Sequence, residues 1–102
     1  MIKKLLGATA LVGLMAVSAF AADDKPAIVF DIGGKFDKSF NESMFNGSEK
    51  FKADTGVAYG EFEIANEAQR EQAIRNFADQ GYSPIIAAGF AQAAAVEKVA
   101  KE

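Results

Sequence analysis

Three short apolar segments alternate with longer stretches whose apolar residues follow a helical spacing. Residues 27–32 (AIVFDI) form an almost unbroken apolar run that begins after Pro26. Such a run is typical of a strand that is buried on both faces of a parallel sheet. Residues 57–64 (VAYGEFEI) and 85–88 (IIAA) predict two further strands, of which the first is partly alternating and therefore less buried.

The first predicted helix begins after a glycine-containing loop. Ser39 followed by Glu42 has the spacing of a capping box, in which each side chain bonds a free backbone N–H group at the helix start. The helix is expected to run to about Asp54, with Gly56 as its C-terminal stop. Its apolar stripe consists of Phe40, Met44, Gly47 and Phe51.

Two more helices follow the second and third strands. Asn66 with Gln69 resembles another helix start, and Gly81 is the expected end of that helix. The alanine-rich residues 91–102 predict a third helix. The apolar side of the second helix carries Ala73, Ile74, Phe77 and Ala78.

This order of elements predicts an α/β fold with a Rossmann-like parallel sheet, right-handed crossovers and helices on both faces. Three strands are few for such a sheet, and one sheet edge is expected to lie bare. We therefore expect residues 22–102 to be the N-terminal part of a larger domain.

Residues 1–21 have the three parts of a secretory signal peptide. Two lysines lie within the first four residues, residues 5–21 carry no charge, and the segment closes with Ala19-Phe20-Ala21. Cleavage is expected after Ala21, and the alternative is a retained membrane anchor. No cysteine is available for a lipid anchor, so we expect a freely exported chain.

Composition removes several classes of chemistry. The 102 residues contain no cysteine and no histidine, which excludes disulfides, cysteine nucleophiles, the usual zinc sites and histidine-based triads. Removal of Lys3 and Lys4 with the signal peptide takes the formal net charge from −3 to −5. An acidic chain of this kind is a poor partner for nucleic acid.

The loop DIGGKFDKSFN, residues 31–41, holds most of the candidate chemistry. Its glycines match neither of the common phosphate-binding motifs. A magnesium or calcium site could use Asp31, Asp37 and Glu42, although the spacing matches no standard ligand loop. Ser39 as a nucleophile would have no histidine to activate it.

A neutral, hydroxylated and flat ligand suits the same loop better. Carboxylates of Asp31 and Asp37 can accept hydrogen bonds from hydroxyl groups, and the Asn41 amide can both donate and accept. Phe40 could stack on a heterocycle, or could instead belong to the core. In open α/β sheets, ligands bind beyond the carboxyl ends of the strands, a rule that also brings in residues 63–66 and 89–90.

The chain resembles the basic membrane protein (purine nucleoside receptor A-like) family of solute-binding proteins of ABC transporters. The resemblance rests on the pattern D-x-G-G-x-x-D-x-S-F-N at residues 31–41, on residues 66–76, and on the strand that ends in Gly89-Phe90. It implies a type I periplasmic-binding fold in which two lobes close on a nucleoside-like solute. The ligand contacts that it implies in this chain are Asp31, Asp37, Phe40, Asn41, Gly89 and Phe90.

The resemblance further implies a periplasmic receptor that meets an ABC permease at the plasma membrane, with no cofactor, no metal and no enzymatic activity. Most members are lipoproteins, and this chain departs from them because it lacks the cysteine. The second lobe is expected to lie outside this chain. Two alternatives remain open, an exported ligand-sensing domain and a carboxylate-based α/β enzyme.

Overall fold

Strands and helices alternate along the chain, as the apolar pattern predicts. The computed structural model describes residues 24–102. The predicted signal peptide, residues 1–21, lies outside this part. Within residues 24–102, none of the helices has the length and apolar character needed to cross a membrane. The elements are β1 (Ala27–Phe30), α1 (Phe40–Thr55), β2 (Gly60–Glu63), α2 (Gln69–Asp79), β3 (Ile85–Ala87), the 3-10 helix η1 (Phe90–Gln92) and α3 (Ala93–Ala100).

The three strands form one parallel sheet in the order β2-β1-β3. The central strand β1 is buried along its whole length, whereas β2 is mostly exposed, which confirms the expected difference between the two. Parallel pairing brings the carboxyl ends of all three strands to one edge of the sheet. The α/β, Rossmann-like fold class is therefore confirmed.

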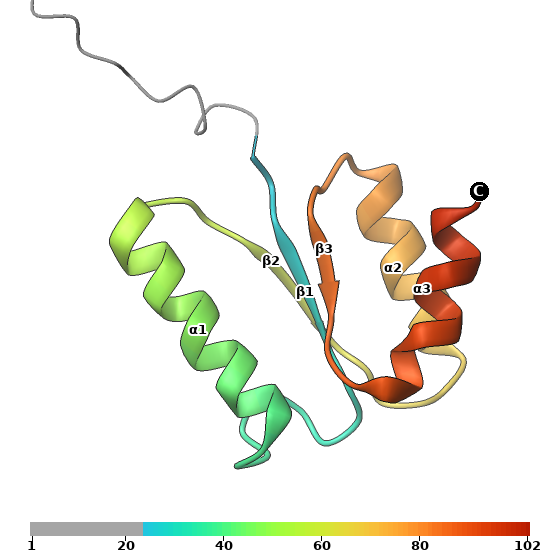
Figure 1. The fold of residues 1–102 in the computed structure, drawn as a ribbon, viewed down its shortest axis with the longest axis horizontal. Coiled ribbons are helices and arrows are strands. Elements are labelled where there is room, and N and C mark those ends of the chain that lie inside the picture. Colours follow the sequence, from blue (N-terminus) through green and yellow to red (C-terminus); the bar gives the residue numbers. More distant parts are fainter. Residues whose placement is uncertain (1–23) are drawn as a thin grey trace, which may run out of the picture.

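Helices cover both faces of the sheet, with α1 on one side and α2 and α3 together on the other (Figure 1). Val29 of β1 anchors the core between the sheet and α2 and α3. The other buried members of this core are Ile64, Ala73, Ile74, Ala95 and Val99.

The α1 face is less completely filled. The rings of Phe30 and Phe45 meet edge to face, with 6.5 Å between their centroids. Farther along α1, Met44, Gly47 and Phe51 line an open hollow of about 480 Å³ against the sheet. The expected apolar stripe of this helix therefore faces a hollow, and its first member, Phe40, lies apart from it.

Strands β1 and β2 are shorter than the sequence predicts, because the residues next to them have no strand partner for their backbone groups. The backbone N–H of Asp31 donates to the side chain of Asn41 and not to a neighbouring strand, so β1 ends at Phe30. Gly60 pairs with Ala27, the first residue of β1, so the residues before Gly60 have no ladder partner.

The predicted helix starts need correction. Ser39 precedes α1 as expected, but its side chain makes no capping hydrogen bond. The second helix begins at Gln69 and not after Asn66, because residues 66–68 form a turn closed by the bond from the Gln69 N–H to the Asn66 carbonyl. Gly56 ends α1 in the left-handed conformation, as predicted.

Candidate functional site

Asp31 lies one residue beyond β1, at the carboxyl edge of the sheet. Its Oδ1 atom accepts a hydrogen bond of 2.7 Å from the backbone N–H of Ile32 and one of 2.5 Å from Nη1 of Arg70. The side chain is largely buried. A carboxylate in such a place is costly unless it is paired, and Arg70 supplies the pairing.

Arg70 is a site residue that the sequence analysis missed. The residue is 5% exposed, and its side chain donates two further hydrogen bonds to Glu67, from Nε to Oε2 at 2.7 Å and from Nη2 to Oε1 at 3.0 Å. The hydrogen bonds to Glu67 outweigh the burial of Arg70, and the contact with Asp31 adds to them, so the pKa of Arg70 lies above its ordinary value. The bond from Arg70 lowers the pKa of Glu67 despite an opposing desolvation.

A signal for Arg70 does exist in the sequence. Residue 70 precedes Ala73, Ile74 and Phe77 at helical spacing, so it falls on the apolar stripe of α2. A lone arginine on a buried stripe indicates a buried anionic partner.

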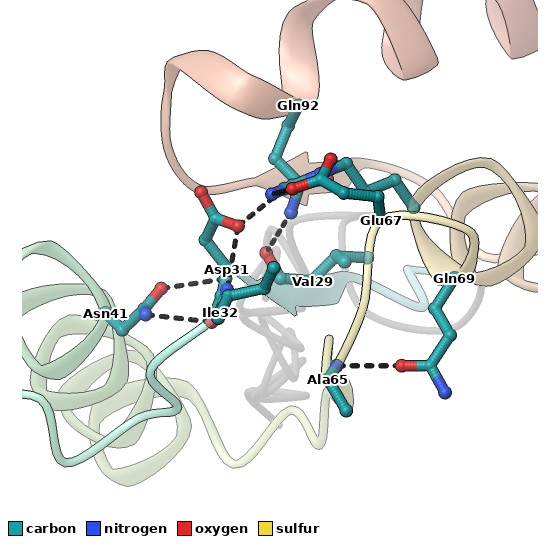
Figure 2. A network of polar contacts seen from close by, with 9 residues as sticks. Val29, Asp31, Ile32, Asn41, Ala65, Glu67, Gln69 and Gln92 are labelled. Carbon is teal, nitrogen blue, oxygen red and sulfur yellow. Dashed lines mark hydrogen bonds and ion pairs between the residues drawn. The ribbon is translucent and has the colours of Figure 1, made fainter.

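Asn41 holds the backbone of Asp31 from the side of α1. Its Oδ1 accepts the Asp31 N–H at 2.9 Å, and its Nδ2 donates to the Asp31 carbonyl at 3.0 Å (Figure 2). Asn41 is 2% exposed. The structure thus gives this amide a role in fixing Asp31, and direct contact with a ligand stays a prediction.

Asp37 caps α1 in place of Ser39. Its Oδ1 accepts from the backbone N–H groups of Ser39 at 2.8 Å and Glu42 at 3.1 Å, and its Oδ2 accepts from Asn41 at 3.4 Å. Desolvation opposes ionisation, but these backbone bonds outweigh it and lower the pKa of Asp37. The carboxylate is directed at the helix start, and a ligand role for Asp37 stays a prediction.

The loop between β1 and α1 is tied to β2. The backbone N–H of Lys35 donates to Glu63 at 2.9 Å, and its Nζ forms an ion pair of 2.6 Å with Glu61. The hydrogen bond to Glu61 outweighs desolvation and raises the pKa of Lys35. The acidic residues of β2 therefore hold this loop in place.

Two exposed aromatic side chains flank one hollow at the carboxyl edge. Phe40, the first residue of α1, is 73% exposed, and Phe90, the first residue of η1, is 95% exposed. Both line a hollow of about 580 Å³, a size that lies within the usual range of ligand pockets. The other lining residues are Ala87, Gly89, Gln92, Ala93, Val96 and Glu97.

Gly89 connects this hollow to Asp31. It has a φ of +96°, and a Cβ placed on it would lie 2.7 Å from Oδ2 of Asp31. Close by, Gln92, the last residue of η1, is buried and donates from Nε2 to the carbonyl of Val29 at 3.4 Å (Figure 2). The structure thus brings together Asp31, Phe40, Gly89 and Phe90, whereas Asn41 and Asp37 act mainly on the backbone.

The metal alternative finds no support in this arrangement. Residues 24–102 contain no group of three or more acidic side chains placed to hold a metal ion. Asp31 and Asp37, two of the three proposed ligands, instead receive hydrogen bonds from Arg70 and from backbone N–H groups.

Comparison with known proteins identifies the family of the chain. A family model described as Bmp, ABC transporter substrate-binding protein PnrA-like, matches residues 25–102. Among curated protein sequences, no match is found.

Two solved structures resemble the chain. An ABC transporter solute-binding protein from Aeropyrum pernix K1 is 26% identical with a TM-score of 0.69, over 76% of this chain and 21% of that one. A fragment of a putative lipoprotein from Peptoclostridium difficile 630 is 22% identical with a TM-score of 0.68, over 76% of this chain and 64% of that fragment, and it shows the shared fold. This chain therefore spans about a fifth of the length of the Aeropyrum protein. Because the family model matches most of its residues, the chain belongs to the Bmp family of PnrA-like ABC transporter substrate-binding proteins.

Proposed function

We propose that this chain supplies the first-lobe ligand contacts of an exported receptor that binds a nucleoside and delivers it to an ABC permease. The observation that carries the proposal is the pair of exposed rings, Phe40 and Phe90, on one hollow beside the carboxylate of Asp31. Exposed aromatic rings are costly in water unless something covers them, and a purine base offers a flat surface for stacking. The carboxylate can accept hydrogen bonds from the hydroxyl groups of a ribose.

Binding suits this site better than catalysis does. Asp31 pairs with Arg70, Glu97 of the hollow pairs with Lys101, and Asp37 accepts backbone N–H groups at the start of α1, so each of these carboxylates already has a partner within the chain. A general acid or base requires a pKa near the operating pH, and the hydrogen bonds to Asp37 lower the pKa of that carboxyl. The fixed charges suit recognition of hydroxyl groups.

The hollow between α1 and the sheet is a weaker candidate for a nucleoside. It lies at the amino ends of β1 and β3, beside Pro26 and Pro84. Ligands of open α/β sheets bind at the opposite edge.

The proposal can be tested by calorimetric titration of the full-length protein with inosine, adenosine, ribose and an amino acid. We expect the two nucleosides to bind, and Phe40→Ala and Phe90→Ala to weaken that binding by about tenfold or more each, as loss of a stacked base costs roughly 1–3 kcal/mol. Phe51→Ala is the matched control, because Phe51 is a half-exposed phenylalanine of α1 that lines the hollow between α1 and the sheet. Absence of nucleoside binding, or an equal loss in the control, would overturn the proposal.

Delivery to a permease requires a separate experiment in cells. A strain that lacks the full-length protein should take up labelled inosine more slowly, and the wild-type gene should restore uptake. Phe90→Ala should restore it only at high inosine concentration. Unchanged uptake in the deletion strain would contradict the transport role.

A further inference from the structure

The further inference rests on the proposed function and concerns Arg70, to which the sequence analysis assigns no role. Arg70 is 5% exposed, and its guanidinium group bonds with Asp31 at one nitrogen and with Glu67 at the two others. The two-point contact with Glu67 fixes the plane of the guanidinium group. With that plane fixed, Nη1 reaches Asp31 from one direction only.

The two carboxylate oxygens of Asp31 have different surroundings. Oδ1 accepts from both the Ile32 N–H and Arg70 (Figure 2). Oδ2 accepts no hydrogen bond from residues 24–102 and lies beside Gly89, which lines the hollow between Phe40 and Phe90. The pairing thus uses one oxygen and leaves the other, beside Gly89, without a hydrogen-bond partner among residues 24–102, on a side chain that is 23% exposed.

The charges of this cluster do not cancel. Arg70 contributes one positive charge, and Asp31 and Glu67 contribute two negative ones. The cluster therefore has a net charge of −1, which attracts hydrogen-bond donors of a ligand. Buried ion pairs add little stability compared with apolar residues of similar size, and the neighbouring stripe positions of α2 are indeed Ala73 and Ile74. Stability alone is therefore a weak reason for an arginine at this position.

We propose that Arg70 is a positioning residue for ligand binding, which holds Asp31 by Oδ1 so that Oδ2 is presented to hydroxyl groups of the bound nucleoside. Glu67 acts on the same contact indirectly by fixing the orientation of Arg70. The three residues thus form one unit whose effect on the ligand passes through Asp31.

A double-mutant cycle on the full-length protein, with inosine as the probe, separates this role from a structural one. Arg70→Gln should weaken inosine binding about tenfold when Asp31 is present, the effect of losing one charged hydrogen bond. In the Asp31→Asn background the same change should alter the affinity by less than about twofold, because Arg70 acts through that carboxylate. Equal losses in the two backgrounds would overturn the proposal. If Arg70→Gln does not fold, Arg70→Lys takes its place, since lysine keeps the charge but cannot make the two-point contact with Glu67.

Arg75→Gln is the matched control. Arg75 lies on the same helix and forms ion pairs with Glu71 and Glu102, but it is much more exposed than Arg70 and does not line the hollow. Its loss should leave inosine affinity unchanged. A loss of affinity as large as that of Arg70→Gln would contradict a specific role for Arg70.

A ligand-free measurement keeps the two proposals distinguishable. In a crystal structure of full-length Arg70→Gln, the Asp31 carboxylate should rotate from its wild-type orientation, because Oδ1 keeps only the Ile32 N–H of its two donors. An unmoved carboxylate would overturn the positioning role, whatever the protein binds. Failure of the wild-type protein to bind inosine would instead count against the proposed nucleoside function.

Discussion

Gly89 lies directly against the carboxylate of Asp31, so that a Cβ at position 89 would come within 2.7 Å of Oδ2. This contact lies at the carboxyl ends of β1 and β3, two strands that pair in the sheet but are far apart in the sequence. The backbone of Gly89 also has a φ of +96°, a region that residues with side chains rarely adopt. Because Phe90 follows immediately, the contact sets where that ring lies relative to Asp31.

Gly89→Ala should lower both stability and affinity. Residues held in sparsely populated backbone regions cost about 1–3 kcal/mol each, and here the new methyl group also displaces the Asp31 carboxylate. We expect a loss of that order in the free energy of unfolding, measured by chemical denaturation, together with weaker inosine binding. The comparison variant is Gly47→Ala on α1, where a Cβ would meet no atom within 4 Å. That change should be neutral or stabilise by about 0.5–1 kcal/mol, as alanine favours a helix interior. Similar effects of the two substitutions would contradict the close contact at position 89.

Asp37, and not Ser39, should determine the stability of the start of α1. Asp37→Ala removes the acceptor of three backbone N–H groups and should lower the melting temperature by several degrees, whereas Ser39→Ala should change it little. Differential scanning calorimetry of both variants provides the measurement. A larger effect from Ser39→Ala would restore the capping box that the sequence predicts.

The contribution of Asp37 should also depend on pH. Backbone hydrogen bonds lower its pKa in the folded protein below the ordinary value of 3.8, so the unfolded chain binds the proton more readily. The stabilising effect is therefore complete above about pH 3.8 and is lost as the pH falls through the lower folded pKa. The difference in melting temperature between wild type and Asp37→Ala should accordingly shrink under strongly acidic conditions. A difference that stays constant with pH would contradict the assignment.

The order of elements could be predicted from the sequence because it depends on local patterns. The run at residues 27–32 marks the buried central strand, and residues 57–64 mark the more exposed one. The exact ends could not be predicted, since tertiary contacts decide them. The Asn41 side chain takes the N–H that would have extended β1, and Asp37 displaces Ser39 as the cap of α1.

The candidate site, too, could be predicted from the sequence only in part. Asp31 and Gly89 could be placed together because both follow parallel strands, whose carboxyl ends share one edge. The partner of Asp31 could not be found this way, because Arg70 lies 39 residues farther along the chain and on a helix. Only its position on an apolar stripe pointed to a buried charge.

Export without a lipid anchor is a prediction that concerns the segment before the described residues. The small residues Ala19 and Ala21 fit a signal peptidase site, and the chain contains no cysteine that could be acylated. Mass spectrometry of the exported protein should therefore show a free N-terminus at Ala22. An intact Met1 or an acylated species would contradict this prediction.

Asn41 should contribute to the stability of the fold, because its buried side chain satisfies both backbone groups of Asp31. Asn41→Ala leaves a partly buried N–H and a carbonyl without these partners, at a cost of about 1–3 kcal/mol for each unsatisfied group. We expect a loss of stability within that range by chemical denaturation, together with weaker inosine binding, since the Asp31 side chain depends on the same backbone. Asn41→Asp should be intermediate, because the carboxylate can still accept from the Asp31 N–H but repels its carbonyl. Asn46→Ala, at an exposed position of the same helix, provides the control and should be nearly neutral. If Asn41→Ala retains wild-type stability and loses affinity alone, Asn41 contacts the ligand directly, and its support of Asp31 is the lesser of its two roles.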